Sequence, residues 1–218
     1  MSEVEPLSVG QQLLLQRLMA AHIMTDHQAR ELFEELSNEM DGAFRSMEHC
    51  FGSINKQLTK GFGLEIATVC MSSGDGDEND ENNNAKQKFH AIINRHDDDV
   101  AKKSFGFSFN LHERALIRLV IEKLVEDGSS DRKTLINLRS DLQEPYKLTL
   151  GQAEHCIEVL LEEEWLILGP EENNGRRRRE SMQAKVQMGP RAYLELSQVL
   201  TNMGMEEDEL PQFIFHRA

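Results

Sequence analysis

The stretch that decides the fold is residues 149–168, TLGQAEHCIEVLLEEEWLIL. Thr149 followed three residues later by Gln152 is the pattern of a capping box, in which each residue bonds the other's backbone at a helix start. Apolar residues then return at helical spacing, at Ala153, Ile157, Leu160 and Leu161. The final WLIL is a short apolar run of the kind found in strands. We predict a helix that passes through a Glu-rich end into a short strand.

The elements on either side complete a small domain. Upstream, Asn110 and Glu113 form a second capping-box pattern for a helix that runs to Asp127. A following helix begins after Asp131 and carries Leu135, Leu138 and Leu142. Downstream, a polar segment separates the WLIL strand from a returning strand at residues 183–188. Pro190 suits the first position of a last helix.

The same order of elements is predicted in the first half of the chain. Helices are expected at 9–21, from Thr25 through Leu36, and at about 41–60, followed by strands at 64–71 and 89–94. Three helices followed by a β-hairpin is the order of a winged-helix domain. We therefore favour a mainly α, α+β fold with tandem winged-helix domains over an unspecific α+β fold.

Two domains follow from this reading, and each has a long polar loop between its hairpin strands. Domain A covers residues 1–108 and has an acidic wing loop at 72–87, whereas domain B covers 109–218 and has an Arg-rich wing loop at 169–181. The length of 218 residues allows two domains of about 100 residues each.

Charge and composition argue against a free-standing nucleic-acid binder. The formal net charge is −14 and the sequence pI is about 5.0, so the chain as a whole should be repelled by phosphate. No signal-peptide pattern opens the sequence, and no apolar stretch approaches the roughly 20 residues of a membrane span. We expect a soluble cytosolic or nuclear protein whose Cys50, Cys70 and Cys156 are buried, reduced thiols.

No complete catalytic or metal site is evident in the sequence. The chain lacks a Gly-rich phosphate loop and a nucleophile elbow, and its eight histidines are scattered. His22 with Asp26, or His112 with Glu113, could be posed as acid–base pairs, but we favour exposed helix residues because no nucleophile accompanies them. A structural zinc site needs paired Cys or His ligands at short spacing, and no C-x-x-C occurs. We therefore predict no catalytic, cofactor or metal ligand.

Two local features have competing interpretations. The run Arg176, Arg177, Arg178 and Arg179 lies in the expected wing of domain B. We favour a solvated hairpin tip, or pairing with the acidic segment 75–81. As a hypothesis, the four guanidinium groups make salt-sensitive phosphate contacts within a larger assembly. Trp165 is expected to fill the core between helix and wing rather than to anchor a partner.

Several segments together resemble one family, the non-structural maintenance of chromosomes element 1 subunit of the SMC five/six genome-maintenance complex. They occur in order over almost the whole chain: QLLLQRLM (12–19), IMT (23–25), INKQL (54–58), LEI (64–66), AIIN (91–94), LINL (135–138), WLI (165–167) and GPRAYLE (189–195). The resemblance implies tandem winged helices followed by a zinc-binding RING-like domain. It also implies a MAGE-type partner, a kleisin partner, promotion of ubiquitin transfer, and a nuclear role in DNA repair and recombination.

The sequence departs from the family at its end. The first zinc cysteines of the family would follow about where residues 213–218 lie, and no zinc ligand can be carried over. The chain is either a fragment of a longer protein or a form that has lost the RING-like domain, and we expect no ligase activity from it alone. The leading hypothesis is a scaffold subunit. The alternative is a winged-helix DNA-binding regulator, which is disfavoured because the helix at 149–164 carries five Glu and no Lys or Arg.

Overall fold

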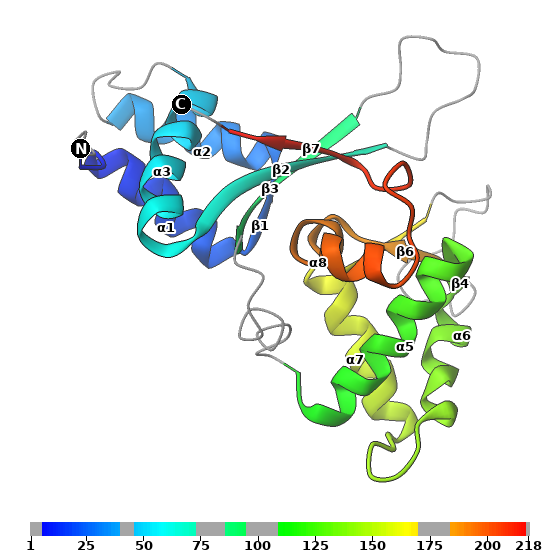
Figure 1. The fold of residues 1–218 in the computed structure, drawn as a ribbon. Coiled ribbons are helices and arrows are strands. Elements are labelled where there is room, and N and C mark those ends of the chain that lie inside the picture. The colour runs from blue at the N-terminus through cyan, green and yellow to red at the C-terminus, as the bar shows by residue number, and fades with distance from the viewer. Residues whose placement is uncertain (1–5, 40–45, 73–85, 95–108, 170–183, 217–218) are drawn as a thin grey trace. The chain divides into compact units, whose positions relative to one another are not determined.

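The computed structural model describes residues 6–39, 46–72, 86–94, 109–169 and 184–216. The chain divides into two compact units, and the second is inserted in sequence within the first. The first unit combines the N-terminal elements with residues 211–216, and the second contains the described residues from 109 to 210 (Figure 1). Within the described residues, none of the helices combines the length and apolar composition that crossing a bilayer requires.

The first unit is a winged helix with one additional strand. Its elements are α1 (Val9–Ala21), β1 (Ile23–Thr25), α2 (Asp26–Glu39), α3 (Met47–Phe62), β2 (Leu64–Ser72), β3 (Lys86–Asn94) and β7 (Gln212–Phe215). All strand pairs are antiparallel and their order is β1-β3-β2-β7. Figure 1 shows β7, drawn in red, beside β2.

The core of the first unit lies between its helices and one face of its sheet. The helices contribute Leu14, Leu18, Ala29, Leu36, Phe51 and Ile54, and the sheet contributes Ile66. The helix ends are defined locally. Gln28 and Thr25 form the predicted reciprocal cap of α2, and Gly63 ends α3 in the left-handed region at φ 67°.

The second unit repeats the arrangement. Its elements are α5 (Leu111–Asp127), β4 (Ser129–Asp131), α6 (Arg132–Asn137), η1 (Leu138–Asp141), α7 (Leu150–Glu162), β5 (Leu166–Leu168), β6 (Lys185–Met188) and α8 (Pro190–Asn202). The sheet order is β4-β6-β5, which matches β1-β3-β2 of the first unit. The predicted capping boxes of α5 and α7 are both formed, and Pro190 opens α8. The predicted α+β class with tandem winged helices is therefore confirmed.

Several boundaries differ from the sequence-based expectations. The second domain was predicted to run through residue 218, but Gln212–Phe215 pairs with Ala67–Cys70 at the edge of the first unit's sheet, because that edge of β2 offers unpaired backbone groups to an extended segment. The three-residue strands β1 and β4 were not predicted, since their lengths are too short for a periodic pattern. The acidic wing begins after Ser72 and ends before Lys86, and its residues 73–85 lie outside the described residues.

Two smaller details also differ from the sequence-based expectations. Helix α3 begins at Met47, with Ser46 as its N-cap, rather than near residue 41. Asp131 stands at the N-cap of α6 without a side-chain cap bond, and its carboxylate instead contacts the Lys185 ammonium at 3.3 Å.

Candidate functional site

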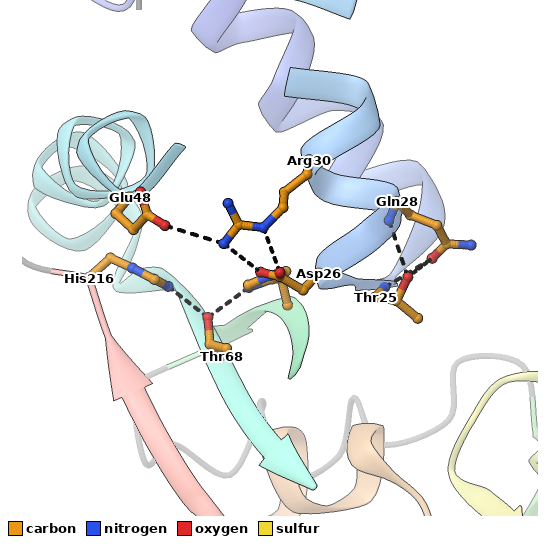
Figure 2. Close-up of polar contacts among 8 residues, drawn as sticks. Thr25, Asp26, Gln28, Arg30, Glu48, Thr68 and His216 are labelled. Carbon is orange, nitrogen blue, oxygen red and sulfur yellow. Dashed lines mark hydrogen bonds and ion pairs between the residues drawn. The ribbon is translucent and has the colours of Figure 1, made fainter. Parts of the chain in front are cut away.

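A connected polar cluster lies inside the first unit, where β7 meets β2. Its members come from four elements and from the residue after β7: Asp26 and Arg30 of α2, Glu48 and Asn55 of α3, Thr68 of β2, His90 of β3, and His216. Figure 2 shows the Thr68 side chain in contact with the His216 ring, and the Arg30 guanidinium between the carboxylates of Asp26 and Glu48. Asp26 and Arg30 lie one helical turn apart on α2, and two members share α3, but the segments themselves are far apart in sequence and only the tertiary fold brings them together.

The cluster contains a hydrogen-bonded chain whose direction is set by Asp26. A carboxylate only accepts, so His90 Nε2 donates to Asp26 Oδ1 at 3.1 Å. In neutral His90 the Nδ1 atom is then an acceptor, and the Thr68 hydroxyl donates to it at 2.7 Å. The Thr68 oxygen is left to accept from His216 Nε2, at 2.6 Å. We call this chain of four residues the relay.

The Arg30 guanidinium supplies positive charge beside Asp26, which is the first residue of the relay. Its Nε donates to Asp26 Oδ2 at 2.6 Å, and its Nη2 lies 3.7 Å from Glu48 Oε1. Burial alone would raise the pKa of Asp26, but hydrogen bonds from Arg30 and His90 outweigh it and lower that pKa. Asp26 is therefore ionised at neutral pH and fixes the proton on His90 Nε2.

Both imidazoles of the relay are held neutral. Burial lowers the pKa of His90 against the opposing effect of Asp26. Burial, with a smaller contribution from the His90 charge, lowers the pKa of His216 to about 4. Glu48 acts in the opposite direction on His216 and Lys88 acts in the same direction. Neutral rings are what the relay requires, because each ring nitrogen then has one defined role as donor or acceptor.

Asn55 connects α3 to the end of the β2–β7 ladder. Its Nδ2 donates to the Ile66 carbonyl at 2.9 Å and to the His216 carbonyl at 3.1 Å. Its Oδ1 accepts from the Ile66 N–H at 2.7 Å. The last β2–β7 register pair is Ala67 with Phe215, so the Asn55 amide bridges the next two residues in place of a further backbone rung.

The order Asp26–His90–Thr68 resembles the order of groups in a nucleophilic triad, but the arrangement is unsuited to catalysis. The Thr68 side chain is 1% exposed, so a substrate cannot reach it. Its oxygen also already accepts from His216. The relay therefore joins elements of the fold, and α2, β2, β3 and the residue after β7 meet in it.

The acid–base pairs considered from sequence do not form. Asp26 pairs with His90 instead of the exposed His22. Glu113 accepts from the Asn110 N–H in the α5 cap, and the His112 ring packs edge-on against Tyr146. No local pattern marked His90 or His216, because their partners lie at sequence distances that helical or strand periodicity does not cover.

The remaining expected features lie in the second unit. Arg176, Arg177, Arg178 and Arg179 fall outside the described residues. Trp165 is 3% exposed and belongs to the core, as predicted. The Arg191 guanidinium lies 4.5 Å from the Trp165 ring centroid and donates to Glu163 at 2.8 Å, which covers the indole at the end of α7.

The described residues do not suit the zinc ion that the family resemblance implies. Cys50, Cys70 and Cys156 are buried free thiols, as predicted. Burial raises the pKa of Cys50 to about 11 and that of Cys156 to about 12, whereas a zinc ligand must be a thiolate. In the part of the chain that the structure describes, His, Cys, Asp and Glu form no group of three or more that could hold a metal ion.

Comparisons with known proteins place these features in context. The family described as the Nse1 non-SMC component of the SMC5-6 complex matches residues 11–196. One similar solved structure, described as an Nse1-Nse3-Nse4 complex, superposes with a TM-score of 0.68 at 20% sequence identity. The similarity covers 91% of this chain and 75% of the solved one. No curated protein sequence gives a significant match.

Proposed function

Because the chain belongs to the family of the Nse1 non-SMC component of the SMC5-6 complex, we propose that it is a protein-interaction scaffold subunit of such a complex. The observation that carries the proposal is the extent of the family match, which spans residues 11–196 and therefore both winged-helix units.

The proposed partners are a MAGE-type subunit and a kleisin subunit. The fold similarity to a chain of an Nse1-Nse3-Nse4 complex supports this assignment. The proposed setting is the nucleus, in DNA repair and recombination, where the complex promotes ubiquitin transfer. We assign the transfer chemistry and its zinc ions to groups other than the described residues of this chain, because those residues do not suit a zinc ion.

The second winged helix favours protein contact over DNA reading. In a DNA-binding winged helix, the helix that precedes the hairpin enters the major groove. Here that helix is α7, which presents exposed Glu158 and Glu162 and carries no Lys or Arg. Phosphates flank both edges of the groove, so these carboxylates would be repelled from it.

The proposal is tested by co-expressing the full chain with a MAGE-type and a kleisin subunit and measuring co-elution by size-exclusion chromatography. We expect a stable complex at micromolar concentration that survives a chelator. Leu116→Asp places a charge at a fully buried core position, so it should unfold the second unit and abolish co-elution. Leu111→Asp, at an exposed position of the same helix, is the matched control for folding.

A DNA-binding measurement distinguishes the scaffold proposal from the alternative function, a DNA-binding regulator. The scaffold proposal expects no measurable affinity of the isolated chain for duplex DNA at physiological salt. Failure to co-elute, together with salt-dependent DNA affinity that Glu158→Lys strengthens, would favour the DNA-binding regulator instead.

A further inference from the structure

The main apolar cluster of the first unit does not include its last strand. The core residues come from α1, α2, α3 and β2, and further apolar side chains of β1 and β3 pack against them. No residue of β7 belongs to this cluster. Phe213 and Ile214 are partly buried and Phe215 is 43% exposed, so all three keep part of their surface in water while β7 is docked.

Polar contacts attach β7 and the residue after it to the rest of the first unit. Its four residues pair with Ala67–Cys70 at the edge of β2. At the far end, His216 donates to Thr68 and its carbonyl accepts from Asn55. The His216 ring also packs edge-on against Phe51, at 5.0 Å between centroids. At the near end, the Lys86 ammonium makes an exposed contact with the Gln212 side-chain oxygen at 3.5 Å.

We propose that β7 is a releasable strap on the first unit, latched by the relay of Asp26, His90, Thr68 and His216, and that it leaves β2 while both units stay folded. Because β7 lies outside the main apolar cluster, its departure leaves that cluster intact, and water can satisfy the freed backbone groups of β2. Ordering β7 costs conformational entropy, and pairing of four residues with β2 offsets only part of that cost. The hydrogen bonds of the relay supply the additional free energy that keeps β7 docked.

Release would have two consequences for the chain. The second unit is inserted in sequence between β3 and β7. While β7 is docked, the chain therefore enters and leaves the second unit from strands of the same sheet. Undocking of β7 would release the second of these two connections from the sheet. The edge of β2 at Ala67–Cys70 would then be open to an extended segment of a partner protein, which binds by adding a strand.

The backbone geometry supplies an internal control for the test. Successive N–H groups of a strand point to opposite edges, and the Ile66 N–H points to the Asn55 edge where β7 lies. The amides of Thr68 and Cys70 therefore point toward β7, and those of Ala67 and Val69 point toward β3. Strap release should expose the first pair and leave the second pair protected.

The experiment is residue-resolved amide hydrogen exchange by NMR on the full chain. His216→Leu removes the donor to Thr68 but leaves the bond between Thr68 and His90 in place. We expect exchange of the amides in β7, and of Thr68 and Cys70, to accelerate by about tenfold or more. The β3-facing amides and the helices of the second unit should change less than about twofold.

Two further variants serve as a rescue and as a control for the exchange measurement. His216→Gln places an amide N–H near the position of Nε2 and should restore most of the protection. Thr201→Val removes a hydroxyl that bonds a backbone carbonyl in α8, and should leave β7 unchanged. Unchanged β7 exchange in His216→Leu would show that the relay is not the latch. Equal acceleration across β2 and β3 would show that β7 is an inseparable part of the unit. Either result overturns the proposal.

Discussion

Replacing Asn55 by Ala removes one amide that satisfies three backbone groups. The Ile66 N–H and carbonyl both bond this side chain, and the His216 carbonyl is the third partner. Asn55 is 4% exposed, so water does not simply take its place. The substitution leaves the Ile66 groups facing a buried gap between α3 and the sheet.

The expected loss of stability follows from these contacts. A buried backbone group that loses its partner costs about 1–3 kcal/mol. Two such groups at Ile66, with partial relief from local rearrangement, give a loss of about 2–5 kcal/mol for the first unit. With a urea m-value of about 1.5 kcal/mol/M for a domain of this size, the unfolding midpoint should fall by about 1–3 M.

Two spectroscopic probes separate the units. The single tryptophan, Trp165, lies in the core of the second unit, so its fluorescence reports on that unit. Far-UV circular dichroism reports on both units. In Asn55→Ala the first phase of the dichroism transition should move to lower urea, while the fluorescence transition moves less. Asn137→Ala, at an exposed position in α6, should shift neither. A dichroism midpoint within about 0.3 M of the wild type would refute the reasoning, since the unpaired groups would then cost almost nothing.

Gly189→Ala should destabilise the second unit by about 2–4 kcal/mol, because an added Cβ would lie 2.2 Å from the Glu164 carbonyl oxygen; the fluorescence midpoint in urea checks this, with the open Gly151→Ala as control. Glu164→Gly should raise the free energy of unfolding of the second unit by up to about 1 kcal/mol and so raise the same midpoint, since Glu164 has φ 59°; a lower midpoint would contradict the strain argument. Acid should weaken the first unit, because burial lowers the pKa of His90 and His216 in the fold. This stability is fully present above pH 6.5 and is lost as the pH falls toward about 4 for His216. After allowance for partial exposure of the ring, His216 accounts for about 1–2 kcal/mol of the loss. Thermal melts across this range should show a shallower decline for His216→Gln, and an equal decline would remove His216 as the cause.

Local sequence predicted the features that local geometry creates. The cap between Thr25 and Gln28 and the cap between Thr149 and Gln152 span three residues each, and both are formed. The burial of Trp165 also followed from its place between a helix and a strand. These features could be predicted because the interacting groups lie within one turn of helix, where spacing in sequence fixes spacing in the fold.

The relay could not be predicted in the same way. Asp26, Thr68, His90 and His216 belong to four different segments, and each alone reads as an ordinary polar residue of a helix or strand. Their convergence depends on the antiparallel register of β2 with β3 and with β7, which places Thr68 directly between His90 and Ile214. A shift of that register by one residue would turn Thr68 to the opposite face of the sheet.

By itself, the sequence determined two winged-helix units, a helix α7 with acidic side chains and no Lys or Arg, and the family resemblance that the family match then confirmed. The tertiary structure alone decided that Gln212–Phe215 returns to the first unit, and that His216 meets Thr68 there. The reason is that a strand's own residues specify that it will be extended, whereas its partner is chosen by which sheet edge has unpaired N–H and C=O groups. That edge belongs to β2, which lies more than a whole domain earlier in the chain.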